Sequence, residues 1–275
     1  MAGVAMSLLQ GLRNLASRWS GLLLVALLLV MDPVTGAATP ALQPLFEQAL
    51  EASRQGDFQA ALPLWDEFLE LAPDQPAAWS NRGNVRLILG DPEGAIVDQA
   101  RAMELAPAEL DPHLNRGIAE EALQHWQQAA SDYNWILERD AVNASALFNL
   151  GNVVGSQGDW LQAEALYSKA SDASPGFAMA SSSKALAVYQ LGEFDLAEKE
   201  LRALIRRYPM FADPRAALSG LLWHYGSFGE AESHWTAAVG LDSRYRQRDW
   251  LLQIRRWPPQ PTADLMDFLA LLEAP

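Results

Sequence analysis

The sequence predicts an all-α solenoid built from six helix-turn-helix units. Its clearest pattern is self-similarity at a period of 34 residues, which is typical of stacked helical repeats. Each unit contains two short patterns with apolar residues at three- and four-residue steps, as amphipathic helices have. Neither helix of a unit can bury its apolar face alone, so the units must stack. The units are 42–75, 76–109, 110–143, 144–177, 178–211 and 212–245.

Small residues recur where the two helices of a unit should touch. Every second helix has an alanine near its start, at Ala61, Ala95, Ala129, Ala163, Ala197 and Ala231. Every first helix has a small residue midway, at Ala49, Gly83, Gly117, Gly151, Ala185 and Ser219. A larger side chain at these positions would push the paired backbones apart, at a cost of about 1–3 kcal/mol. The pattern therefore predicts close helix pairs.

Turn residues mark the ends of the predicted helices. Glycine, which favours a left-handed C-cap, ends five first helices, and Gln124 takes its place in the third unit. Proline ends four second helices because it lacks the amide donor that a helix needs. Ala141 and Ser243 replace that proline in the third and sixth units. The glycines are Gly56, Gly90, Gly158, Gly192 and Gly226, and the prolines are Pro73, Pro107, Pro175 and Pro209.

Over Leu42–Tyr245 these placements resemble the tetratricopeptide repeat family. The resemblance implies a right-handed superhelical solenoid whose first helices line a concave groove. It also implies recognition of a protein or an extended peptide in that groove. The first and sixth units depart from the family pattern at Leu45 and Arg215, where tryptophan is usual, as end units often do.

The C-terminal residues 246–275 follow the last unit. We expect Arg246–Trp257 to form a seventh first helix and Thr262–Glu273 to form a helix that caps the open end. The stretch Ala231–Pro259 is similar to a group of tetratricopeptide proteins of cyanobacteria and chloroplasts, some of them tied to thylakoids. That resemblance implies a periplasm or thylakoid lumen, and a role in assembly or maintenance of a membrane-associated photosynthetic complex.

Residues 1–38 read as a secretory signal peptide, followed by a short linker at 39–41. Arg13 and Arg18 precede the 11-residue apolar run Gly21–Met31, and small residues suitable for cleavage lie near Ala37 and Ala38. An 11-residue helix is about 16 Å long, shorter than the roughly 30 Å hydrocarbon core of a bilayer. We therefore predict an exported protein. The alternative is association with a membrane through an uncleaved anchor at residues 15–31.

Composition excludes several function classes. The chain has no cysteine, so disulfides and thiol chemistry are absent, and its net charge of −14 argues against nucleic-acid binding. Thr39–Glu198 holds 24 acidic and 8 basic residues, whereas Lys199–Pro275 holds 9 and 10. This asymmetry fits a solvated acidic face or a polarised molecule whose C-terminal end docks on something acidic.

No catalytic constellation or cofactor motif is evident in the sequence. The four histidines, His113, His125, His224 and His234, lack the spacing of metal ligands. Adjacent carboxylates such as Glu120 and Glu121 point to different helix faces. We therefore predict a protein that is not an enzyme and holds no cofactor or metal.

The helical period projects a set of polar and aromatic residues toward the groove. Asparagine offers a donor and an acceptor, so asparagines that recur every 34 residues could bond the backbone of a peptide. Large aromatic residues that face solvent often mark a binding surface. The alternatives are family consensus for the asparagines and packing for the aromatics. The predicted protein- or peptide-binding residues are Phe46, Asn81, Asn84, Asn115, Ile118, Phe148, Asn149, Asn152, Tyr189 and Trp223.

The groove does not match the site with which co-chaperone members of the family grip a C-terminal carboxylate. That site needs lysine and arginine on consecutive first helices, whereas Asp111 here would repel a carboxylate. Arg82, Arg86 and Arg116 lie nearby, and we expect them to pair with local acids such as Asp98, Asp132 or Glu120; a differently arranged anion site is the alternative.

A second function hypothesis is structural self-assembly. Arg244–Trp257 contains two tryptophans and five arginines, and it could dock on the acidic N-terminal units of another copy.

Overall fold

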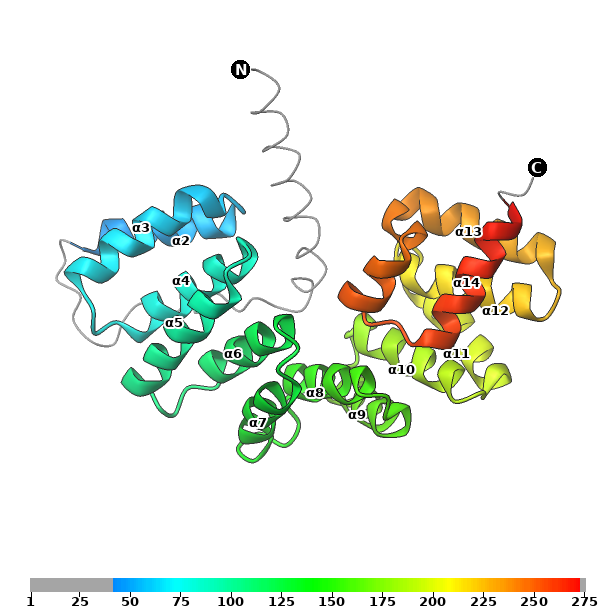
Figure 1. Ribbon diagram of the computed structural model, residues 1–275, viewed down its shortest axis with the longest axis horizontal. Helices are drawn as coiled ribbons and strands as arrows, with labels where there is room; N and C mark the ends of the chain where they lie inside the picture. Colours follow the sequence, from blue (N-terminus) through cyan, green and yellow to red (C-terminus); the bar gives the residue numbers. More distant parts are fainter. Residues whose placement is uncertain (1–41, 273–275) are drawn as a thin grey trace, which may run out of the picture. The chain divides into compact units, whose positions relative to one another are not determined.

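The computed structural model describes residues 42–272 and is all-helical there, which confirms the predicted fold class (Figure 1). The described residues fall into two compact units. Unit 1 runs to Ala141 and contains α2 (Gln43–Arg54), α3 (Phe58–Leu71), α4 (Pro76–Ile88), α5 (Pro92–Leu105), α6 (Asp111–Ala122) and α7 (Trp126–Leu137). Unit 2 starts at Val142 and contains α8 (Ala144–Ser156), α9 (Trp160–Ala173), α10 (Ala178–Gln190), α11 (Phe194–Arg207), α12 (Ala212–His224), α13 (Phe228–Leu241) and α14 (Pro259–Leu272).

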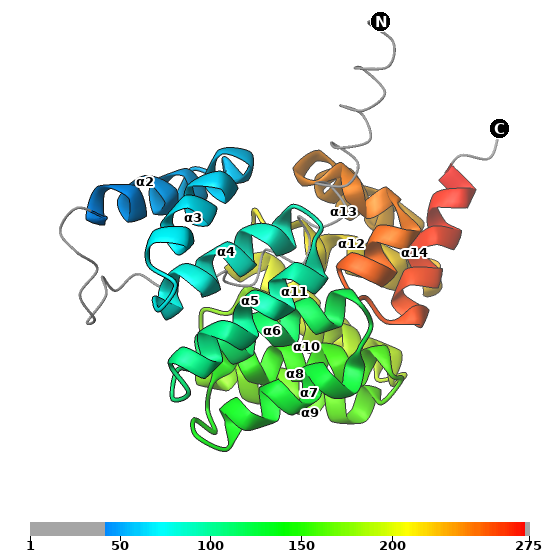
Figure 2. The same ribbon diagram turned by 60° about the vertical axis from the view of Figure 1, so that its left-hand side comes forward.

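Consecutive helices pair within each unit, as Figure 2 shows for α2 with α3 and for α4 with α5. The small residues lie where the paired helices touch. A Cβ atom at Gly117 would lie 2.5 Å from Cε1 of Tyr133, and one at Gly151 would lie 2.7 Å from Cε1 of Tyr167. The six second-helix alanines are all buried. Both findings confirm that the pairs need small residues at these positions.

The turns between paired helices have the backbone that the sequence predicts. The five turn glycines have positive φ angles, and Gln124 adopts the same left-handed conformation with φ 60°. A side chain is strained there because its Cβ crowds the following carbonyl oxygen.

We expect Gln124→Gly to raise the free energy of unfolding by up to about 1 kcal/mol. Glycine relieves the left-handed strain, although its greater freedom in the unfolded chain offsets part of the gain. Urea unfolding measures the change. Gln128→Gly, which places glycine inside α7, should lower the stability instead. A loss of stability in both variants would contradict the assignment of strain to Gln124.

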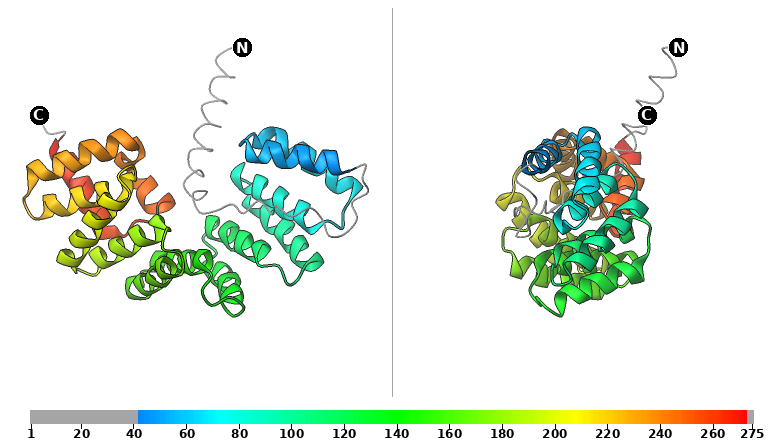
Figure 3. Two further views of the ribbon diagram at one scale, coloured as in Figure 1. Left: turned by 180° about the vertical axis from the view of Figure 1, so that it is seen from behind. Right: turned by 90° about the vertical axis from the view of Figure 1, so that its left-hand side faces the viewer.

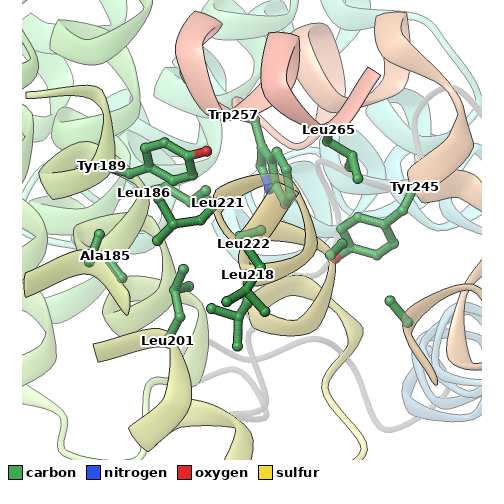
Figure 4. Packing of buried hydrophobic residues seen from close by; sticks show 14 of the residues in the cluster. Ala185, Leu186, Tyr189, Leu201, Leu218, Leu221, Leu222, Tyr245, Trp257 and Leu265 are labelled. Atoms are coloured by element: carbon green, nitrogen blue, oxygen red, sulfur yellow. The ribbon is translucent and has the colours of Figure 1, made fainter. Parts of the chain in front are cut away.

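The prediction of a first helix at Arg246–Trp257 was wrong, whereas the predicted last helix is present as α14. Residues 246–257 form no regular first helix; the chain makes a short 3-10 turn at Ser243–Arg246 and a π-helical turn at Trp250–Ile254. The last helix, α14, packs against the first helices α12 and α10 (Figure 1, Figure 3). It therefore lies along the first helices, where Tyr189, Trp257 and Leu265 share one core (Figure 4).

Candidate functional site

Each first helix has a set of positions on the side opposite its mid-helix small residue, here called the inner stripe. The mid-helix glycines Gly83 and Gly117 face the second helix, where their Cβ atoms would meet Gln99 and Tyr133. A helix turns by about 100° per residue. The positions six and two residues before, and one and five residues after, the mid-helix small residue therefore point roughly to the opposite side. This small residue is Gly83, Gly117, Gly151 or Ser219. The inner stripes are Ala77, Asn81, Asn84 and Ile88 on α4; Asp111, Asn115, Ile118 and Ala122 on α6; Ser145, Asn149, Asn152 and Ser156 on α8; and Asp213, Ala217, Gly220 and His224 on α12.

A buried cluster of amides joins the inner stripes of α4 and α6 in unit 1. The Gln99 side-chain amide donates to the Ser80 carbonyl at 2.9 Å and to Oδ1 of Asn84 at 3.0 Å. Asn115 Nδ2 donates to Ser80 Oγ at 3.3 Å, which links α6 to α4. Two predicted site residues, Asn84 and Asn115, are therefore linked through Gln99 and Ser80, and Asn81 and Ile118 lie on the same inner stripes.

The amide cluster keeps unused hydrogen-bonding groups. Asn81 is 0% exposed, yet neither its Nδ2 nor its Oδ1 has a partner. Asn84 Nδ2 and Gln99 Oε1 are likewise buried and unpaired. A buried polar group without a partner costs about 1–3 kcal/mol, so native proteins rarely keep several together. A ligand that brings its own donors and acceptors can therefore bond these atoms only where the neighbouring side chains move aside.

Asp111 lies in the first turn of α6, one turn before Asn115 of the amide cluster. Its side chain is half-buried, and the described residues supply no ion pair or hydrogen bond to its carboxylate. Burial and the neighbouring Glu109 raise the pKa of Asp111, because both disfavour its charged form. The inner stripe of α6 thus carries an acid without a counter-ion.

The nearby arginines are occupied by acids of the second helices, as predicted. Arg82 makes a two-point contact with Asp98, at 2.7 and 2.9 Å, and a third bond to Asp66. Arg86 also donates to Asp98, at 3.0 Å. These arginines therefore tie the helices of unit 1 together, and no anion site forms from them.

Arg116 follows the same rule in the third repeat. It holds Asp132 through two bonds of 2.7 and 2.8 Å, and His113 lies 2.9 Å from the same carboxylate. Burial opposes ionisation of Asp132, but the hydrogen bonds from His113 and Arg116 outweigh it and lower the Asp132 pKa. The expected pairing of Glu120 with an arginine is not found, since Glu120 meets His125 at 2.7 Å.

In unit 2, a buried carboxylate on the inner stripe of α12 gathers the C-terminal residues. Asp213 is 0% exposed and accepts from Arg255 Nη2 at 2.6 Å, Tyr245 OH at 2.7 Å and Trp257 Nε1 at 2.9 Å. Ser182 of α10 also donates to it, at 2.5 Å. Asp213 is therefore the counter-ion and acceptor that holds the chain after α13 against α12.

Helix α14 continues along the same stripe. The Tyr189 hydroxyl of α10 donates to Asp264 at 2.7 Å, and the backbone N–H of Gln260 donates to Gln190 Oε1 at 2.7 Å. At Gly220 the backbones approach so closely that a Cβ atom would lie 2.9 Å from the backbone nitrogen of Leu265. The C-terminal segment, residues 245–272, therefore covers the inner stripe of α12.

We expect Gly220→Ala to loosen α14, because the added methyl group meets backbone rather than a movable side chain. The variant should lose about 1–3 kcal/mol of stability through overpacking. Hydrogen exchange of residues 259–272 should rise with it. Gly229→Ala in α13 is the matched control, since a Cβ atom there meets nothing within 4 Å. If both variants exchange alike, the close contact of α12 with α14 is wrong.

Of the predicted aromatic site residues, Phe46, Phe148 and Tyr189 are buried and Trp223 is half-buried. Phe46 is buried against Trp65 and Phe68, with ring centroids 5.1 and 5.2 Å apart. Phe148 is buried between Tyr167 and Phe177. These rings fill space between neighbouring helices, so the packing alternative holds for them.

The two C-terminal aromatics belong to the core of unit 2. Tyr189 is 0% exposed, because α14 covers it, and burial together with Asp264 raises its pKa. Trp223 is half-buried and packs against the same core. The expectation that Tyr189 is an accessible binding residue is therefore wrong.

The remaining predicted residues lie on α8. Asn149 is buried with its Nδ2 atom unpaired, like Asn81 at the same repeat position. Asn152 accepts a hydrogen bond from the Tyr167 hydroxyl at 3.0 Å. The inner stripe of α8 therefore has one buried, unpaired amide nitrogen, at the repeat position that Asn81 occupies in unit 1.

Sequence reasoning missed the serine–aspartate pair that recurs on the inner side of the repeats. Ser182 donates to Asp213, which holds the C-terminal segment. The same two positions three repeats earlier are Ser80 and Asp111. The 34-residue register contains this signal. It could have been found by comparing the units position by position.

The segment proposed for self-assembly is mostly engaged inside unit 2. Trp250 and Trp257 are buried, Arg255 pairs with Asp213, and Arg244 pairs with Asp242 at 2.7 Å. Arg246 and Arg248 are exposed.

Within residues 42–272, no group of three or more histidine, aspartate and glutamate side chains could hold a metal ion. No helix in the same range has the length and apolar character needed to cross a bilayer. The predicted signal peptide at 1–38, the linker at 39–41 and the anchor at 15–31 lie outside the described residues.

Comparison with known proteins identifies the family of this chain. A tetratricopeptide repeat model matches residues 46–110, 114–178 and 182–246. The chain is 35% identical to human sperm-associated antigen 1 over 97 residues, which is 35% of this chain and 10% of that protein. It is 32% identical over 102 residues to a DnaJ homolog subfamily C member 7 homolog of Schizosaccharomyces pombe, 36% of this chain and 21% of that protein. The chain thus spans a small part of these relatives.

Among solved structures, the chain is similar to PilF of Pseudomonas aeruginosa, with a TM-score of 0.63 and 16% identity over 74% of this chain and 92% of that one. At this identity the likeness concerns the fold.

Proposed function

Because the chain belongs to the tetratricopeptide repeat family, whose members are protein-interaction scaffolds, we propose that it is a non-catalytic scaffold that binds a protein or an extended peptide. The proposed binding surface is the inner stripe of α4 and α6 in unit 1. The inner stripe of α12 is covered by the C-terminal segment, so it is not the main site.

The observation that carries this proposal is the set of orphan amides on α4. Asn81 and Asn84 leave three buried side-chain atoms without partners. A peptide backbone supplies alternating N–H and C=O groups, which match an asparagine amide in both roles. Since these amides are buried, we expect the neighbouring side chains to move when a ligand binds.

We also propose where the protein acts. The signal-like residues 1–38 support export. The resemblance of Ala231–Pro259 to tetratricopeptide proteins of cyanobacteria and chloroplasts supports a periplasm or thylakoid lumen, and a role in assembly or maintenance of a membrane-associated photosynthetic complex. The alternative is an anchor at residues 15–31. N-terminal sequencing of the protein purified from its native source separates them: a start near Thr39 supports export with cleavage, and an intact Met1 favours the anchor.

The binding proposal is tested by Asn81→Leu, which replaces the orphan amide by an apolar group of similar size. Removing an unpaired buried amide should leave the protein equally or more stable, because nothing is left unsatisfied. The same change should reduce crosslinked capture of partners from native membranes by about tenfold, as the loss of one or two hydrogen bonds predicts.

Asn134→Leu is the matched control, because Asn134 is exposed on the second helix α7. Its capture pattern should equal that of the unchanged protein. Equal capture by the Asn81 and Asn134 variants would remove the inner stripe of α4 from the binding surface.

Self-assembly through Arg244–Trp257 is the weaker alternative, because of its five arginines only Arg246 and Arg248 are exposed and both of its tryptophans are buried. A monomer in sizing chromatography at both low and high salt would exclude it.

A further inference from the structure

Unit 1 holds an acid that lacks the partner its counterpart in unit 2 has. Asp111 and Asp213 occupy the same position of repeats three and six, at the start of α6 and α12. Ser80 and Ser182 correspond in the same way, one repeat earlier. The two units therefore carry a serine and an aspartate at the same two repeat positions, and in unit 2 the serine donates to the aspartate.

The chain itself shows what this pair binds. In unit 2 the guanidinium of Arg255 donates to Asp213 at 2.6 Å, inside a core that excludes water from both groups. In unit 1 Ser80 accepts from Asn115 instead, and no cation of the described residues reaches Asp111. A partly buried carboxylate without a counter-ion is unfavourable, and an incoming cation relieves it.

The excess of acidic side chains in unit 1 favours a cationic ligand. The arginines nearest Asp111 are already paired with other acids. Residues 42–141 hold 18 acidic and 6 basic side chains. The arginines nearest the site, Arg82 and Arg116, are held by Asp98 and Asp132. Among the described residues, no counter-ion for Asp111 is therefore left over in residues 42–141.

The orphan amides form a second, independent feature of the same site. Asn81 and Asn84 lie on α4, whose Ser80 is hydrogen-bonded to Asn115, one turn after Asp111 on α6. Their unpaired atoms are buried, so a peptide backbone that passes beside Asp111 bonds them once the neighbouring side chains move aside.

We propose that unit 1 binds a protein segment that presents an arginine, whose guanidinium pairs with Asp111 while its backbone bonds the orphan amides of Asn81 and Asn84. Arginine suits this site because its planar guanidinium pairs with a carboxylate while remaining only weakly hydrated, as Arg255 does with Asp213. The inference rests on the proposed peptide-binding function and names the chemistry of the ligand.

The test uses the full chain and pools of 12-residue peptides that are random except for one central residue, fixed as arginine, glutamine or glutamate. The unchanged protein should retain the arginine pool about tenfold better than the glutamine pool and exclude the glutamate pool. Asp111→Asn should abolish the preference for arginine. Asp111→Lys should reverse it in favour of glutamate, a gain that an unfolded protein cannot produce.

Glu67→Gln removes one exposed negative charge from α3 and is the control for net charge. It should keep the arginine preference. The inference is overturned if Asp111→Asn prefers the arginine pool as strongly as the unchanged protein does. It is also overturned if the unchanged protein retains none of the pools. Retention that depends on Asn81 but shows no preference at the central residue overturns it as well, while leaving the proposed function standing.

Discussion

Asp213→Ala should be among the most destabilising single changes in unit 2. The substitution leaves Arg255 charged and buried without a partner, and it removes the acceptor of Tyr245 and Trp257. Breaking a buried ion pair from one side costs about 3–5 kcal/mol. Urea unfolding should show a loss of that size, and hydrogen exchange should show residues 245–272 opening first.

Two comparisons isolate the cause of this loss. Asp213→Ala combined with Arg255→Leu should recover part of the stability, because no unpaired charge is then buried. Glu230→Ala breaks the exposed pair with Arg202 and should cost at most about 1 kcal/mol. A similar small loss for Asp213→Ala would mean that the C-terminal segment is held by apolar packing alone.

Trp65→Ala should destabilise unit 1 by about 3–5 kcal/mol, the usual cost of emptying a large core site. Trp65 is 0% exposed, stacks edge-on with Phe46 and donates to Ser53 Oγ at 3.0 Å. The fall in the free energy of unfolding can be followed by circular dichroism during urea titration.

Leu71→Ala, at the exposed end of the same helix, is the matched control and should change stability by less than about 0.5 kcal/mol. Equal effects of the two substitutions would contradict the placement of Trp65 in the core of unit 1.

Much of the fold could be read from local sequence rules. The recurring alanines and glycines marked the places where paired helices touch. A larger side chain at these positions would clash with the neighbouring helix. Gln124 was found in the turn because the register marks that position, even though glutamine is a poor residue for a left-handed turn.

The candidate site was only partly predictable. The helical period placed Asn81, Asn84 and Asn115 on one side of the first helices, and the structure brings them together through Ser80 and Gln99. The period could not separate a ring that faces solvent from one that fills a gap between helices, as Phe46 does. That difference depends on the neighbouring helix, which local spacing does not contain.

The sequence by itself determined the repeats, the small contact residues and the turns, because these follow from backbone geometry within 34 residues. Only the tertiary structure decided the course of the chain after α13. Arg255, Tyr245 and Trp257 meet a buried acid more than thirty residues earlier, and Gly220 leaves room for α14. The pairing energy of a buried charge depends on which distant groups surround it, so local sequence could not show that this segment lies along α12.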